Sequence, residues 1–148
     1  MIARELMTPD PLTVSPQATV AEVWDLMREA DIRHVPVVEA DGLVGMVSDR
    51  DLARVDIARL LRVEGAGALQ DELAMPVVRL MNPVVIAVGP EADVGEVIEL
   101  LITHRIGAVP VMQEETRQVL GIISYVACCG RCRACSRRTD RGPVSAEP

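Results

Sequence analysis

An internal duplication is the feature that most constrains how this chain of 148 residues can fold. The run Met7-Thr8-Pro9 returns 74 residues later as Met81-Asn82-Pro83, and Pro36 returns at the same offset as Pro110. Gly45 and its later copy are 76 residues apart, so the second copy gains two residues between its strands, in a turn predicted at 113–118. A register kept over tens of residues and broken only in a turn indicates two copies of one structural unit.

The first copy begins with a helix that has a recognisable start and end. Thr19 and Glu22 have the spacing of a capping box, in which each side chain bonds the backbone of the other residue. Apolar residues then recur at helical spacing up to a predicted end near Asp31. The pattern therefore predicts one amphipathic helix here.

Two strands and a second helix follow in the same copy. The β-branched runs 34–38 and 43–47 predict a hairpin, and Ser48 is placed to cap a helix over 49–55. With a short strand near Val14, each copy reads β-α-β-β-α. A unit of about 50 residues buries too little surface to be stable alone. We therefore expect an α+β fold in which tandem repeats pack about a pseudo-two-fold axis.

The duplication also divides the chain into segments. We expect a first repeat at 1–55, a connector at 56–75, a second repeat at 76–127 and a tail at 128–148. Within the connector, the run 65–67 (Gly-Ala-Gly) is typical of a flexible link.

Charge and hydropathy exclude several functional classes. Residues 1–127 carry 10 Arg against 20 acidic residues, and an acidic body disfavours nonspecific nucleic-acid binding. No apolar run reaches the roughly 18 residues of a membrane span, and no signal-peptide pattern opens the chain. We expect a cytoplasmic protein with no membrane or nucleic-acid partner.

Four segments, each with a counterpart in the second copy, carry a resemblance to a known family: 7–9, 18–20, 32–38 and 43–51. In this order the set resembles the CBS (cystathionine β-synthase type) domain pair, or Bateman module, across residues 1–127. The resemblance implies a stand-alone regulatory module that binds AMP, ADP, ATP or S-adenosylmethionine between its repeats. It also implies a homodimer of CBS pairs and a regulated partner protein that the sequence does not identify. Residues 1–127 contain no Cys, and the two His lack a paired nucleophile or a metal-ligand cluster, so we expect no enzymatic activity.

The resemblance assigns the ribose and base of the ligand to the first repeat. The Asp51 carboxylate can accept hydrogen bonds from both ribose hydroxyls, with Ser48 facing the same cleft, although both residues could simply cap a helix. Leu12 and Ile32 would line the base slot, although both could be ordinary core. The complete predicted set is Leu12, Ile32, Arg33, Ser48, Arg50, Asp51, His104 and Arg105.

The phosphate of the ligand is assigned to the second repeat. His104 and Arg105 occupy the positions of Ala30 and Asp31 in the first copy, which cannot bind phosphate. Arginine is well suited to bidentate phosphate contact, and His34 could supplement the pair. The alternative is a solvated helix end, where basic residues also favour the negative pole of the helix.

A second, weaker site is expected at the equivalent positions Ile86, Ile106 and Ser124. There the ribose carboxylate is replaced by Ala127, which cannot accept a hydrogen bond. We therefore expect one competent site per chain.

The tail departs from the family pattern, and three interpretations of it stay open. Its cysteine spacing is usable for zinc or an iron–sulfur cluster, its lack of apolar residues is typical of disorder, and its abrupt onset would also fit an altered reading frame. A metal or redox protein acting through this tail is thus one alternative function, and a ligand-free interaction module is another. The four candidate metal ligands are Cys128, Cys129, Cys132 and Cys135.

Overall fold

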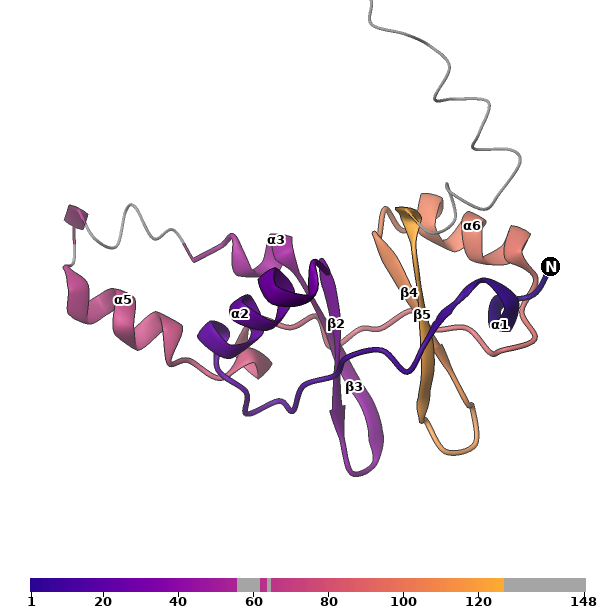
Figure 1. Ribbon diagram of the computed structural model, residues 1–148, viewed down its shortest axis with the longest axis horizontal. Coiled ribbons are helices and arrows are strands. Elements are labelled where there is room, and N and C mark those ends of the chain that lie inside the picture. The colour runs from indigo at the N-terminus through magenta and orange to yellow at the C-terminus, as the bar shows by residue number, and fades with distance from the viewer. Residues whose placement is uncertain (56–61, 64, 127–148) are drawn as a thin grey trace, which may run out of the picture.

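Two similar α+β units lie side by side in the computed structural model, which describes residues 1–55, 62–63 and 65–126 (Figure 1). Each unit is a β-hairpin covered by a helix. The first unit contains α2 (Val20–Ala30), β2 (His34–Glu39), β3 (Gly42–Ser48) and α3 (Asp49–Leu52). The second contains α6 (Val94–Thr103), β4 (Ala108–Met112) and β5 (Val119–Ser124). The two hairpins point the same way, so that the turns of both lie at the lower edge in the view of Figure 1.

The predicted first helix is confirmed as α2. Thr19 Oγ1 accepts a hydrogen bond from the Glu22 N–H at 3.2 Å, and Glu22 Oε2 accepts one from the Thr19 N–H at 2.7 Å. The helix ends at Asp31, whose φ of 52° is left-handed. A residue in this conformation cannot continue a right-handed helix, so the end of α2 follows directly.

The hairpins also match the sequence prediction. His34 pairs with Ser48 in the antiparallel register of β2 and β3, and Ala108 pairs with Ser124 in that of β4 and β5. The turn predicted at 113–118 lies between β4 and β5 as expected. The helix predicted over 49–55 is shorter, because α3 ends at Leu52.

The opening segment of each repeat packs on the other repeat. The short helix α1 (Ala3–Leu6) buries Ala3 and Leu6 in the core of the second unit. The strand β1 (Thr8–Pro9) then joins the sheet of that unit beside β5. Neither α1 nor this placement was predicted from the sequence.

The equivalent segment after the connector makes the reciprocal contacts. The 3-10 helix η2 (Val77–Arg79) buries Val77 in the core of the first unit, and Asn82 bridges to Met46 in β3. The hydrogen bond from Ala3 N–H to Ala92 O, 2.8 Å long, is mirrored by one from Val77 N–H to Ala18 O at 2.7 Å. The two units therefore exchange segments about the pseudo-two-fold axis and form one folded body.

The connector contains more regular structure than the sequence predicted. The helix α5 (Ala66–Leu73) begins directly after Gly65, whose φ of 86° suits a glycine. Residues 65–67 were expected to form a flexible link, and that expectation is wrong because Ala66 and Gly67 form the first turn of α5. No helix within the described residues is long and apolar enough to span a membrane. The predicted division into segments at residues 55, 75 and 127 stays a prediction.

Candidate functional site

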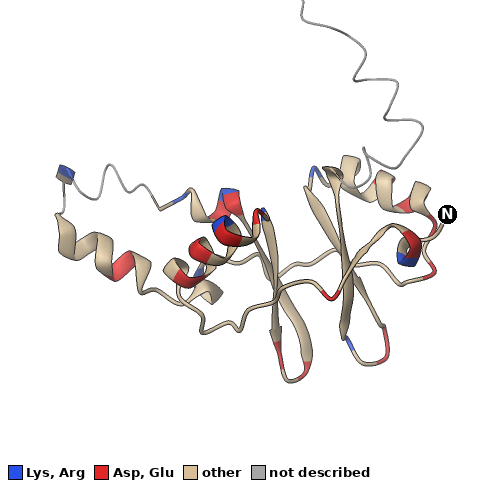
Figure 2. Cartoon of the chain, in the orientation of Figure 1, with Lys and Arg blue, Asp and Glu red and all other residues tan. Residues whose placement is uncertain are grey.

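The candidate site lies at the open ends of the hairpins, opposite their turns. In the first unit β3 ends at Ser48, and α3 starts at Asp49. In the second unit α6 ends just before His104 and β4 begins at Ala108. Figure 2 shows acidic and basic segments of the ribbon at this end of both units.

Ser48 and Asp51 form a capping box at the start of α3. Asp51 Oδ2 accepts hydrogen bonds from the Ser48 N–H at 2.8 Å and from the Ser48 hydroxyl at 2.9 Å. The Asp51 N–H in turn donates to Ser48 Oγ over 3.3 Å. These bonds fix the half-buried carboxylate on the helix start and use Oδ2, whereas Oδ1 takes part in none of the three. The capping role is therefore real, and it leaves one oxygen with which Asp51 could meet a ligand.

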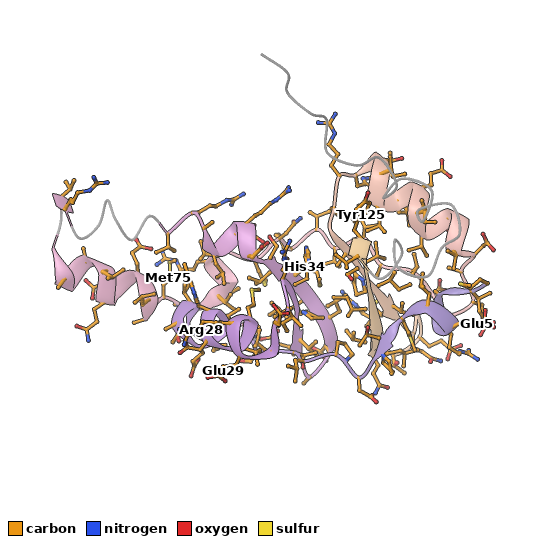
Figure 3. The ribbon with its side chains drawn as sticks, turned by 45° about the horizontal axis from the view of Figure 1, so that its top comes forward. Glu5, Arg28, Glu29, His34, Met75 and Tyr125 are labelled. Carbon is orange, nitrogen blue, oxygen red and sulfur yellow. The ribbon has the colours of Figure 1, made fainter. Side chains whose placement is uncertain are left out.

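The imidazole of His34 connects this helix start to the second unit. A Cβ atom added to Gly107 would lie 2.6 Å from His34 Cε1 and 2.7 Å from Nε2, so the ring occupies the space that this glycine leaves free. Figure 3 shows His34 on the side of the first unit that faces the second, where Tyr125 follows β5. The Tyr125 N–H donates to the Gly107 carbonyl at 2.8 Å.

The predicted phosphate residues immediately precede this contact. His104 is the C-terminal cap of α6, and the exposed Arg105 has a left-handed φ of 52°. Gly107 lies only two residues after Arg105 in the chain. The segment that carries Asp51 and the segment that carries Arg105 therefore meet through His34 and Gly107, at one junction between the units.

Burial dominates the electrostatics of His34. Desolvation of the ring lowers the pKa of His34 below its usual 6.5, and the charges of Arg33 and Arg50 lower it further. The nearby carboxylates of Asp49 and Asp51 act in the opposite direction and raise it. Since the net pKa is lowered, the ring is neutral at pH 7.

The remaining residues predicted for the first site differ in exposure. Arg33 and Arg50 are exposed at the open end of the first hairpin. Ile32 is half-buried and packs against the core of the first unit, as a slot-lining residue can. Leu12 keeps 49% of its surface exposed, so the first core does not enclose it.

The residues of the predicted second site belong to different parts of the second unit. Ile106 packs against the core of the second unit, and Ser124 is the last residue of β5. Ile86 lines a surface hollow of about 630 Å³ near the turn of the second hairpin. Ala127 and the four tail cysteines lie outside the residues that the structure describes. Within the described part of the chain, no cluster of His, Cys, Asp and Glu could hold a metal ion.

Two hollows lie away from the junction. The hollow that contains Ile86 has an acidic lining that would repel phosphate: Glu91, Glu96, Glu114 and Glu115. The other, of about 470 Å³, lies between the lower ends of the two units and includes Asp10 and Glu39. Neither hollow contains Asp51 or Arg105.

Comparison with known families settles what kind of unit is duplicated. The CBS domain family matches the chain twice, over residues 3–58 and 77–127. The chain belongs to the CBS domain family. The structural similarity agrees with this assignment: AcuB from Vibrio cholerae is 30% identical, with a TM-score of 0.72 over 86% of this chain and 87% of that one.

Two further CBS structures have been solved with adenosine compounds. The CBS domain pair of protein MJ0100, in complex with 5′-methylthioadenosine and S-adenosyl-L-methionine, has a TM-score of 0.70 at 20% identity and covers 86% of this chain and 91% of that one. CBSX2 in complex with AMP has a TM-score of 0.70 at 24% identity, over 85% of this chain and 91% of that one. At these identities the two structures establish the shared fold, which is a tandem CBS pair of the α+β class.

Proposed function

We propose that this CBS pair is a regulatory module that binds one adenine nucleotide at the junction between its repeats. The observation that supports the proposal is the contact of His34 with Gly107, because the Asp51 charge acts on His34 and Gly107 follows Arg105 by two residues. The adenosine ligands of MJ0100 and CBSX2 support the same class of ligand for this fold. S-adenosylmethionine is the alternative ligand within that class.

Asp51 is proposed to hold the ribose. Its Oδ2 atom is already engaged by Ser48, so Oδ1 is the acceptor that can meet a ribose hydroxyl. A hydrogen bond to a charged acceptor contributes about 1.5–3 kcal/mol. Ribose binding would thus add to the existing cap without breaking it.

Arg105 and His104 are proposed to hold the phosphate. Both are exposed at the C-terminal end of α6, and their counterparts Ala30 and Asp31 offer no cation. The pseudo-symmetric position therefore has a negative charge where this one has a positive charge. Such asymmetry supports a single phosphate-binding site per chain.

The test is calorimetry with AMP, ATP and S-adenosylmethionine on protein freed of co-purified ligand, checked by mass spectrometry after denaturation. We expect binding in a ratio of one ligand per chain. The absence of heat and of any thermal shift with all three compounds would favour the alternative function, a ligand-free interaction module.

Asp51→Asn is the sharpest variant for this test. The Asn carbonyl oxygen can still accept the hydrogen bonds from Ser48, while its NH₂ group presents a donor where the ribose hydroxyl needs an acceptor. AMP affinity should fall roughly 10- to 150-fold, the equivalent of one charged hydrogen bond. Glu22→Gln is the matched control, because Glu22 fills the same position in the capping box of α2. It should leave AMP affinity unchanged.

Regulation by this module requires that the nucleotide prefer one of two states of the protein, since a ligand shifts an equilibrium only by its difference in affinity. The proposed states differ in how the CBS pair docks on its own copy or on a regulated partner. Sedimentation with and without AMP tests the homodimer part of this proposal. A single monomeric species under both conditions would contradict it.

A further inference from the structure

His34 is a half-buried imidazole at the contact between the repeats, where the pseudo-two-fold symmetry is broken. Its ring fills the space beside Gly107. The equivalent residue of His34 in the second repeat is Ala108, and the equivalent of Gly107 in the first repeat is Arg33. The symmetry-related contact therefore has no imidazole. Of the two pseudo-equivalent residues, His34 and Ala108, only His34 has a side chain that can bind and release a proton near neutral pH.

Charged groups surround His34 on the side of its own unit. From the start of α3, Asp49 and Asp51 favour the protonated ring and Arg50 disfavours it, and Arg33 beside it in the chain also disfavours it. From the second unit Gly107 faces the ring, and the titratable residue beside it is Tyr125, whose N–H donates to the Gly107 carbonyl. Burial is the largest influence and keeps the ring neutral at pH 7.

We propose that His34 couples nucleotide binding to the uptake of one proton from water, and that the ligand is therefore a phosphorylated adenosine. This inference rests on the proposed function, because it gives His34 a role in the same site. A phosphate dianion placed by Arg105 near the Gly107 segment favours the charged imidazolium, which can then donate a hydrogen bond to it. The positive sulfonium of S-adenosylmethionine would favour the neutral ring and no proton uptake.

The direct test follows the histidines by NMR. The chain contains only two, so the ring C2–H signals of the ligand-free protein are assigned by comparison with His104→Asn. The His34 signal should titrate below pH 6.5 without ligand and at a higher pH with saturating AMP. Adenosine, which has no phosphate, should leave the His34 titration where it was.

Calorimetry supplies a second readout. Titrations of AMP at pH 7 in buffers with different ionisation enthalpies should show proton uptake by the wild-type protein, and less uptake by His34→Asn. The wild-type affinity should rise as the pH falls from 8 to 7, by at most about tenfold for that one pH unit. The affinity of His34→Asn should be nearly constant over the same interval.

The outcomes separate this inference from the proposed function. AMP binding that weakens with Asp51→Asn, but leaves the His34 titration unchanged, overturns the inference and keeps the function. Tighter binding of S-adenosylmethionine than of AMP overturns the phosphate assignment. Absence of binding by every adenosine compound overturns both. If His34→Asn does not fold, the NMR titrations of the unmodified protein decide the question.

Discussion

Arg105 should be a residue at which stability and ligand binding respond in opposite directions to one substitution. Its φ of 52° places it in the left-handed region, as does the φ of 52° of Asp31 at the equivalent end of α2. A non-glycine residue in this region costs about 1–2 kcal/mol. Glycine removes that cost, but it increases the conformational entropy of the unfolded chain, which lowers the free energy of unfolding by about 0.4–1 kcal/mol. Arg105→Gly should therefore raise the free energy of unfolding by about 0.5–1 kcal/mol, which corresponds to a Tm roughly 2–4 °C higher.

The same substitution removes the guanidinium proposed to hold phosphate. Loss of one charged hydrogen bond costs about 1.5–3 kcal/mol, so AMP affinity should fall roughly 10- to 150-fold. Asp31→Gly is the matched control, since it gives the same backbone relief at the equivalent position without removing a cation. It should raise the Tm at least as much, because it also removes a negative charge from the negative end of α2. AMP affinity should stay at the wild-type value.

Thermal unfolding and AMP calorimetry on the three proteins decide the matter. Wild-type affinity in Arg105→Gly at low ionic strength would refute the phosphate role of Arg105. A lower Tm in both glycine variants would refute the strain argument. Arg105→Lys separates charge from geometry: it should retain part of the affinity, because an ammonium offers attraction without a bidentate fork.

Three further predictions concern stability. Because burial lowers the pKa of His34 in the folded state, the unfolded chain takes up a proton on this residue at a higher pH than the folded protein does. The free energy of unfolding should therefore fall as the pH drops below 6.5. Urea titrations between pH 7.5 and pH 5.5 should show a smaller fall for His34→Asn than for the wild-type protein. Gly107→Ala should destabilise the protein by about 1–3 kcal/mol, because the added methyl group lies 2.6 Å from the His34 ring, and the cost should shrink when His34 is also replaced by Ala. Leu6→Ala should cost about 2–5 kcal/mol, and hydrogen exchange should show the loss in the second unit, although Leu6 belongs to the first repeat in the sequence.

The sequence predicted the elements whose signals are local. Thr19 and Glu22 form the capping box that their spacing indicated, and Ser48 caps α3 as predicted, with Asp51 completing a second capping box. The four hairpin strands were equally evident, because they are short runs rich in valine and isoleucine with few polar residues. A cap or a hairpin is specified by residues a few positions apart, so one sequence suffices to find it.

The packing of each repeat's opening segment, which contains α1 or η2, on the other repeat was not predictable from such local signals. A helix of four residues such as α1 shows too little periodicity to be recognised. Nothing local indicates that Ala3 and Leu6 pack in the distant core rather than the nearer one. Their placement depends on contacts between residues far apart in the chain, such as the hydrogen bond from the Ala3 N–H to the Ala92 carbonyl and the packing of Leu6 in the core of the second unit.

The sequence indicated individual residues of the candidate site but not the contact between the repeats. Ser48 and Asp51 were identified, and their mutual hydrogen bonds explain why a capping role and a ligand role were both open. The contact between His34 and Gly107 was missed. One signal could have found it: a glycine stands where the first copy has Arg33, and glycine is typical of positions where another group approaches the backbone closely.

The proposed binding site can be tested by a crystal structure of the AMP complex. It should contain one AMP per chain at the junction, with a ribose hydroxyl within hydrogen-bond distance of Asp51 Oδ1 and the phosphate in contact with Arg105. AMP that touches residues of a single repeat, or that lies in either of the hollows near the hairpin turns, would contradict it.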